Sequence, residues 1–163
     1  MMFSENSAKE LNYLFNLLQS AQEEEQIKDI ECKIWEIWME SGTPQINILM
    51  EQGCEALANG DFSAAIRTFT TIISLNPDYP EAWNKRATAY YLRGNYKSSI
   101  EDIRQTLDRE NRHFGALSGL ASIYLTIGDF KGALKTYENL LKIYPYDQNF
   151  KKQMSLLRKK LDI

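Results

Sequence analysis

The fold of this chain is decided by the stretch ALANGDFSAAIRTFTTIISLNP, residues 56–77, because its pattern returns twice more at one spacing. A glycine recurs every 34 residues, at Gly60, Gly94 and Gly128. Small, aromatic and branched residues that recur in register over three units indicate a repeat architecture. The other positions related by the same step are Phe62, Tyr96 and Phe130; Ala65, Ser99 and Ala133; Ile66, Ile100 and Leu134; and Pro77, Asn111 and Pro145.

Each unit is expected to form two helices. In the first unit, the helices are predicted over about residues 46–59 and 62–75, with Gly60 and Asp61 turning the chain between them. A glycine at the end of a helix suits a left-handed backbone, and the Asp or Asn that follows suits the N-cap of the next helix. Two helices joined by so short a turn run antiparallel.

These motifs resemble those of tetratricopeptide repeat (TPR) proteins, whose 34-residue units form helix–turn–helix pairs. The resemblance covers about residues 46–146, and the chain departs from the family pattern at Arg86, where leucine is usual, and at Asn111, where proline is usual. It implies an all-α fold, a right-handed α-solenoid of antiparallel helix pairs with repeats at about 46–79, 80–113 and 114–147. The middle unit matches the pattern with Trp83, Ala87, Tyr90, Gly94, Tyr96, Ser99 and Ile103.

Two helical segments are expected to flank the repeats. Residues 1–44 carry two apolar stripes of helical period and predict a degenerate leading hairpin that packs its Ile/Trp face on the first repeat, since a terminal repeat lacks one neighbour. Residues 148–163 combine spaced apolar residues with five basic ones and predict a capping helix whose basic side faces water. The alternative for this last segment is a basic helix lying on a membrane surface.

Composition and charge narrow the class of partner and the location. A net charge of −3 and a pI of about 5.3 leave no basic field for a phosphate backbone, so nucleic acid is not expected as a partner. No apolar run approaches the ~20 residues of a membrane span. The first residues lack the features of a signal peptide, which predicts a cytoplasmic protein; a periplasmic or organellar location stays open if a leader has been removed. Cys32 and Cys54 are expected as free thiols, with a disulfide as the alternative.

Catalytic and metal sites are not expected in this sequence. His113 is the single histidine, and neither cysteine lies near it in sequence, so a zinc site of His and Cys ligands lacks material. The glycines recur singly at helix ends and nowhere as a phosphate-binding loop. A nucleophilic pair of Cys54 and His113 would have to meet across more than one repeat. We therefore expect no enzyme and no cofactor.

The resemblance implies that the first helices of the repeats line a concave face that holds a peptide or helical partner. The expected function is non-catalytic protein binding, as an adaptor or assembly factor. The alternative is a homo-oligomer that uses this groove or the ends of the solenoid, and the N-terminal hairpin is a further candidate to fill the groove. The partner-facing positions carried over from the family are Asn47, Met50, Cys54, Glu81, Asn84, Lys85, Thr88, Tyr91, Ser118, Ser122 and Thr126.

One subclass of partner is disfavoured by the same comparison of positions. TPR proteins that clamp the carboxylates of chaperone C-terminal tails use Lys and Asn in the first unit and Lys and Arg in the third. The corresponding positions here hold Met50, Cys54, Gly115 and Gly119. The sequence therefore predicts that the chain lacks this clamp.

Overall fold

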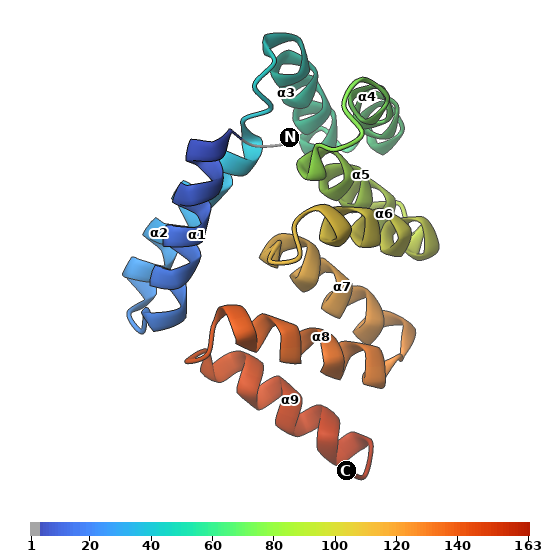
Figure 1. Ribbon diagram of the computed structural model, residues 1–163. Helices are drawn as coiled ribbons and strands as arrows, with labels where there is room; N and C mark the ends of the chain where they lie inside the picture. Colours follow the sequence, from blue (N-terminus) through green and yellow to red (C-terminus); the bar gives the residue numbers. More distant parts are fainter. Residues whose placement is uncertain (1–3) are drawn as a thin grey trace. The chain divides into compact units, whose positions relative to one another are not determined.

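The computed structural model describes residues 4–163, which form α-helices and no strand (Figure 1), so the all-α prediction is confirmed. Residues 1–3, which belong to the stretch on which the signal-peptide prediction rests, lie outside the described residues. The helices are α1 (Glu5–Ser20), α2 (Glu24–Met39), α3 (Pro44–Ala58), α4 (Phe62–Leu75), α5 (Pro80–Leu92), α6 (Tyr96–Arg109), α7 (Phe114–Ile127), α8 (Phe130–Ile143) and α9 (Gln148–Lys160).

The turns inside the helix pairs have the predicted geometry. Gly60, Gly94 and Gly128 adopt φ values of 77°, 80° and 78°, in the left-handed region that glycine tolerates at a helix end. Asp61 then accepts a capping bond from the Ala64 amide at 2.9 Å, and Asp129 caps α8 in the same way. Asn95 occupies the N-cap of α6, but its side chain makes no capping bond.

The chain divides into two compact units, each with its own contacts. The first unit contains Trp38–His113 together with Ser4, and in it α3 packs on α4, α4 on α5, and α5 on α6. Its core is centred on the fully buried Phe69 and Ile72, with Tyr79 and Met50 beside them. The side chain of Met39, the last residue of α2, packs against this core.

Arg86, which departs from the family pattern, has a partner in the next helix. Its guanidinium donates to both carboxylate oxygens of Asp102 on α6, at 2.7 and 2.9 Å, and it lies over the Trp83 ring at 5.2 Å. The hydrogen bond to Asp102 raises the pKa of Arg86. A bidentate charged pair between α5 and α6 thus takes the place of an apolar contact.

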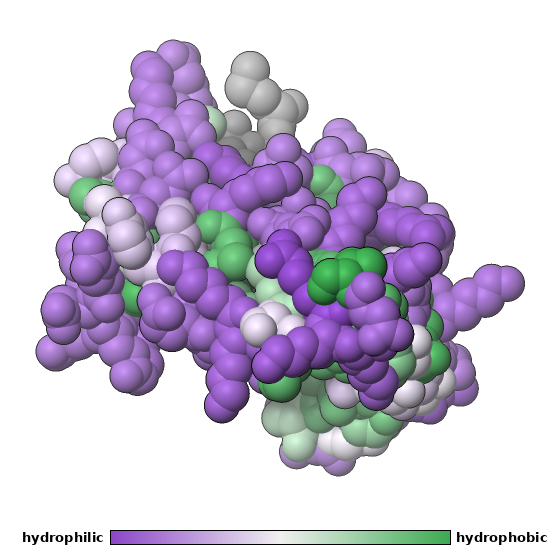
Figure 2. All heavy atoms as spheres, turned by 90° about the horizontal axis from the view of Figure 1, so that it is seen from below, coloured by the Kyte–Doolittle hydropathy of each residue, from purple (hydrophilic) through white to green (hydrophobic). Residues whose placement is uncertain are grey.

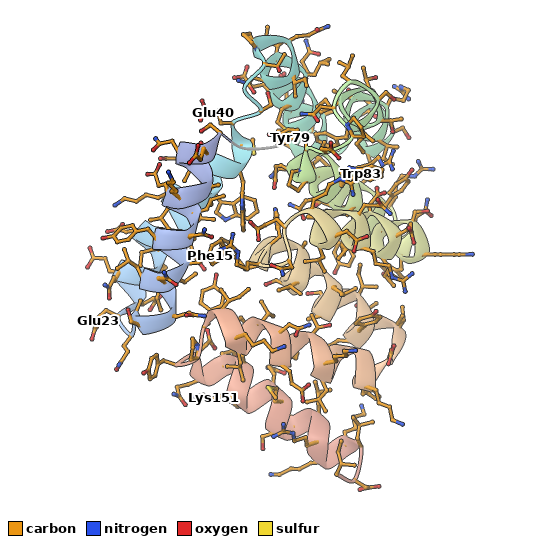
Figure 3. The ribbon with its side chains drawn as sticks, viewed as in Figure 1. Phe15, Glu23, Glu40, Tyr79, Trp83 and Lys151 are labelled. Atoms are coloured by element: carbon orange, nitrogen blue, oxygen red, sulfur yellow. The ribbon has the colours of Figure 1, made fainter. Side chains whose placement is uncertain are left out.

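The second unit contains Glu5–Ile37 and Phe114–Ile163, so the N-terminal hairpin is grouped with the third helix pair. Within it α1 contacts α8, and Phe114 at the start of α7 meets three aromatic rings. The centroids of Phe15, Trp35 and Tyr144 lie 6.5, 5.5 and 5.9 Å from that of Phe114. Figure 3 shows Phe15 on the side of α1 that faces this cluster.

Two hydrogen bonds also connect the N-terminal hairpin to the end of α8 and the residue that follows it. The Tyr144 hydroxyl donates to Glu31 on α2, and the Gln19 amide donates to the Lys142 carbonyl at 3.1 Å. Burial first, and then the bond to Glu31, raise the pKa of Tyr144. Within the second unit, Trp35 of the Ile/Trp face packs on Phe114 of α7. The apolar stripe shows which face of a helix is buried, but it does not determine which surface covers that face.

The last helix, α9, packs on α8 through its apolar side. Met154 and Leu157 are buried, and the Phe150 ring lies 5.8 Å from Tyr137. The basic residues face outward, and Figure 2, seen from below, shows a largely hydrophilic surface with small apolar groups. The exposed basic residues of α9 are Lys151, Lys152, Arg158, Lys159 and Lys160.

Gly53 on α3 lies where a side chain would disturb the core. A Cβ atom there would overlap the ring of Phe69, which is fully buried. We expect Gly53→Ala to lower the free energy of unfolding by about 2 kcal/mol, because overlap with a fully buried ring falls at the upper end of the ~1–3 kcal/mol cost of overpacking and the better helix propensity of alanine returns about 1. Urea denaturation followed by circular dichroism measures the change. Ser74→Ala on the exposed face of α4 is the control, and an unchanged Gly53→Ala midpoint would contradict the close packing.

Candidate functional site

The predicted partner-facing residues of α5 lie along one face of the helix at a spacing of three to four residues. Their exposure differs sharply along that face. Glu81 and Asn84, near the start of α5, are buried, and Lys85 is half-buried. Thr88 and Tyr91, one and two turns further on, are exposed. The structure thus divides this row into a covered part and an open part.

Glu81 is a fully buried carboxylate with three polar partners. Its Oε2 lies 2.8 Å from Nε2 of His113, the last residue of the turn between α6 and α7. Its Oε1 accepts from the Asn84 amide at 3.2 Å and lies 3.4 Å from Nζ of Lys85. A buried carboxylate is costly unless it is paired and hydrogen-bonded, and these groups provide that compensation.

The end of α2 covers this buried polar group. The indole of Trp38 stacks on the imidazole of His113 with ring centroids 4.1 Å apart and an interplanar angle of 10°, and both residues have no exposed surface. The Tyr79 hydroxyl donates to the Met39 carbonyl at 2.9 Å. Burial first, and then Glu81 and Cys54, raise the pKa of Tyr79.

The connection between α2 and α3 continues along the same unit. The Ser41 hydroxyl donates to Oδ1 of Asn47 at 2.6 Å, so a predicted partner-facing residue of α3 is bonded to the chain itself. Met50, one turn further along α3, is only 2% exposed and belongs to the core of the unit. Cys54 is half-buried, and burial raises the pKa of its thiol.

Three sequence-based assignments therefore need correction. Met50, Glu81 and Asn84 were expected to line an open surface, but the first lies in the core and the other two lie in the buried polar group next to Trp38. The family register gives the side of the helix on which a residue lies, and it carries no information on segments outside the repeat. Sequence reasoning also missed the role of Trp38 and His113 at this place.

The predicted residues of α7 belong to the second unit, and the structure brings them together on one exposed face. Ser118, Ser122 and Thr126 are spaced by four residues. Ser122 donates to the Ser118 carbonyl at 3.0 Å, and Thr126 donates to the Ser122 carbonyl at 2.8 Å. Each hydroxyl oxygen keeps acceptor capacity toward solvent.

Catalytic and metal-binding material is sparse in the part of the chain that the structure describes. No group of three or more His, Cys, Asp or Glu residues there is arranged to hold a metal ion. Cys32 is exposed, Cys54 is half-buried, and both are free thiols. No helix among residues 4–163 has the length and apolar character needed to cross a membrane.

The family model described as tetratricopeptide repeat matches residues 50–110 and 93–148, which together span more than half of the chain. The chain belongs to the tetratricopeptide repeat family. The predicted class, an all-α TPR solenoid, is confirmed.

Relatives of this TPR protein occur in bacteria and fungi. A TPR repeat-containing protein from Rhizobium etli is 37% identical over 158 residues, which cover 97% of this chain and 78% of the relative. Small glutamine-rich tetratricopeptide repeat-containing protein 2 from Mycosarcoma maydis is 26% identical over 113 residues. The match covers 69% of this chain but only 32% of that longer protein.

Solved TPR structures have the same fold. The Sgt2 TPR domain from Aspergillus fumigatus is similar with a TM-score of 0.64 at 25% identity, covering 74% of this chain and 81% of that one. The first TPR of Spaghetti (RPAP3), bound to an HSP90 peptide, has a TM-score of 0.65 at 19% identity, covering 72% and 94%. The predicted exclusion of chaperone tails gains no support from these comparisons, because TPR domains of similar fold carry such peptides.

Proposed function

We propose that this TPR protein is a non-catalytic interaction module, an adaptor or assembly factor, that binds a peptide or helical segment of another protein on the first helices of its repeats. The observation that carries the proposal is the open part of these helices. Several residues on the sides that the family uses for partners are exposed and therefore accessible to another protein. They are Thr88 and Tyr91 on α5, and Ser118, Ser122 and Thr126 on α7.

The chemistry of these surfaces suits a polypeptide. Small hydroxyl side chains let a partner backbone approach, and their free lone pairs accept hydrogen bonds from its amides. Tyr91, Leu92 and Leu125 add exposed apolar area on the same two helices, with exposed fractions of 36%, 49% and 36%. Exposed aromatic and aliphatic groups among neutral polar ones are typical of peptide-binding surfaces.

The proposal is tested by affinity capture with charge-inserting variants and matched controls. Ser118→Glu/Ser122→Glu and Thr88→Glu alter the proposed surfaces, whereas Ser155→Glu on α9 and Thr71→Glu on α4 place the same charge on other exposed helix faces. Circular dichroism first establishes that all variants are folded. We expect wild type and the control variants to capture the same amount of a partner protein, and the surface variants to capture at least tenfold less of it. Equal recovery by all variants would contradict the proposal.

Self-assembly is the second candidate function, and the distribution of charge favours it. Residues 5–37 carry eight acidic and three basic residues, whereas residues 148–163 carry five basic and one acidic. Because the two segments carry opposite net charges, the acidic segment of one copy is complementary to the basic segment of another. Self-assembly through these charges would give a mass that rises with concentration at low salt and falls toward the monomer mass at high salt. A constant monomer mass in light scattering would exclude it.

A further inference from the structure

Residues 38–43, which we call the 38–43 segment, lie against Asn47, a position that the family pattern assigns to a partner, and against His113, which bonds a second such position, Glu81. Trp38 stacks on His113, which bonds Glu81. The Met39 carbonyl accepts a hydrogen bond from the Tyr79 hydroxyl, and the Ser41 hydroxyl donates one to Asn47. The 38–43 segment thus contacts Asn47 on α3 and the residues that end the turns before α5 and α7, Tyr79 and His113, all within the first unit. The contacts involve ring stacking, a backbone carbonyl and a side-chain amide, which are the groups through which an external peptide would be held.

We propose that the 38–43 segment is an intramolecular ligand, and that a partner helix or peptide bearing an aromatic side chain displaces it to bind the same surface. The inference rests on the proposed protein-binding function and adds to it the centre of the site and the kind of residue that the site accepts. The centre is the Trp38 seat, which consists of Glu81, Asn84 and His113.

The polar character of the Trp38 seat supports exchange. A position that is buried permanently gains more from well-packed apolar residues than from a charged or titratable pair, because burying such a pair costs desolvation free energy. The Trp38 seat instead contains a carboxylate and an imidazole, both without exposed surface. When Trp38 leaves, water solvates both groups, and this offsets part of the lost contact. The seat is therefore compatible with a covered state and an open state.

The flat stacking contact sets the preference for an aromatic residue. The two rings are nearly parallel, at 10°, with centroids 4.1 Å apart, so the imidazole presents its face to whatever occupies the seat. Trp, Tyr and Phe restore a stacked contact of this kind, whereas an aliphatic side chain does not. The seat therefore selects a partner segment with an exposed aromatic residue.

The open part of α5 gives an external segment an advantage over the internal one. Beyond the seat, Thr88 and Tyr91 continue the same helix face and are exposed while the 38–43 segment is in place. A partner segment that extends from the seat along α5 contacts these side chains as well. Its additional contacts supply the free energy that displaces the internal segment.

The test uses the full-length chain and a fluorescein-labelled peptide of residues 27–44 as the probe. Trp38→Ala empties the seat, whereas Trp83→Ala removes an indole from the same unit and leaves Trp38 in place. We expect the peptide to bind Trp38→Ala at least tenfold more tightly than wild type, as measured by fluorescence anisotropy. Trp83→Ala is expected to behave as wild type, and a peptide that itself carries Trp38→Ala is expected not to bind.

A second variant covers the case in which Trp38→Ala does not fold. Tyr79→Phe removes the hydrogen bond to the Met39 carbonyl, and Ser41→Ala removes the hydrogen bond to Asn47. The double variant therefore loosens the 38–43 segment without leaving a large cavity. It is expected to bind the peptide more tightly than wild type. If no folded variant with a loosened or removed segment binds better than wild type, the inference is overturned.

The outcomes separate this inference from the proposed function. Tight peptide binding by Trp38→Ala without any captured partner protein would support the seat and count against the adaptor function. Capture of a partner that depends on Ser118 and Ser122, combined with no peptide binding by Trp38→Ala, would support the adaptor function and overturn the intramolecular ligand.

Discussion

Phe69→Ala is expected to lower the free energy of unfolding by about 3–5 kcal/mol, the range for removing a large aromatic side chain from a core. Phe69 has no exposed surface and lies between α3 and α5 in the first unit, where Gly53 leaves room for its ring. Its loss leaves a cavity that the surrounding helices fill only in part. Chemical denaturation followed by circular dichroism gives the difference from wild type.

The control for Phe69→Ala lies on the same helix. Leu75 is 51% exposed, so Leu75→Ala should change stability by no more than about 0.5 kcal/mol, as is usual for surface substitutions. Both variants shorten a side chain of α4 to the same residue. A loss below about 1 kcal/mol for Phe69→Ala would mean that the core of the first unit does not depend on this ring.

Glu81→Ala is expected to cost a similar amount, about 3–5 kcal/mol, for a different reason. The substitution leaves the buried His113 and the Asn84 amide without the carboxylate that both contact. A buried polar group that loses a hydrogen bond does not recover it from water, so the loss costs more than it would at the surface. Glu81→Gln retains the volume and one acceptor oxygen, so it should cost distinctly less than Glu81→Ala. Thermal and urea unfolding of both variants measure this order.

Glu101→Ala is the matched control for Glu81→Ala. Glu101 lies on α6 with its side chain 59% exposed, and its contact with Arg104 is a surface ion pair. Such pairs contribute about 0–1 kcal/mol, so this variant should remain close to wild type. Equal effects of Glu81→Ala and Glu101→Ala would show that the buried carboxylate contributes no more than a surface one.

The features that the sequence predicted correctly depend on neighbours along the chain. The left-handed backbone of Gly60 and the capping bond of Asp61 involve residues that are at most a few positions apart. A period of 34 residues then repeats each local solution in register. The helix pairs and their turns were therefore accessible from the sequence alone.

The features that were missed depend on residues far apart in sequence. Arg86 and Asp102 are 16 positions apart, and Trp38 and His113 are 75 apart. The stripe through Trp35 and Trp38 predicted an apolar face, but the rings that contact these two residues are Phe114 at the start of α7 and His113 in the turn before it, and the repeat pattern does not specify either contact. One signal was available: Tyr79 and His113 are ring-bearing residues at equivalent positions, 34 apart, where two turns end.

The connection between α2 and α3 is only four residues long, residues 40–43, with Gly42 in a left-handed conformation. Trp38, which so short a connection joins to α3, faces the Trp38 seat at an effective concentration in the millimolar range. A partner present at micromolar concentration must therefore bind about a thousandfold more tightly than the tethered segment, a difference of about 4 kcal/mol, before it takes over the surface. The length of this connection thus sets a threshold that weak, abundant aromatic peptides do not pass.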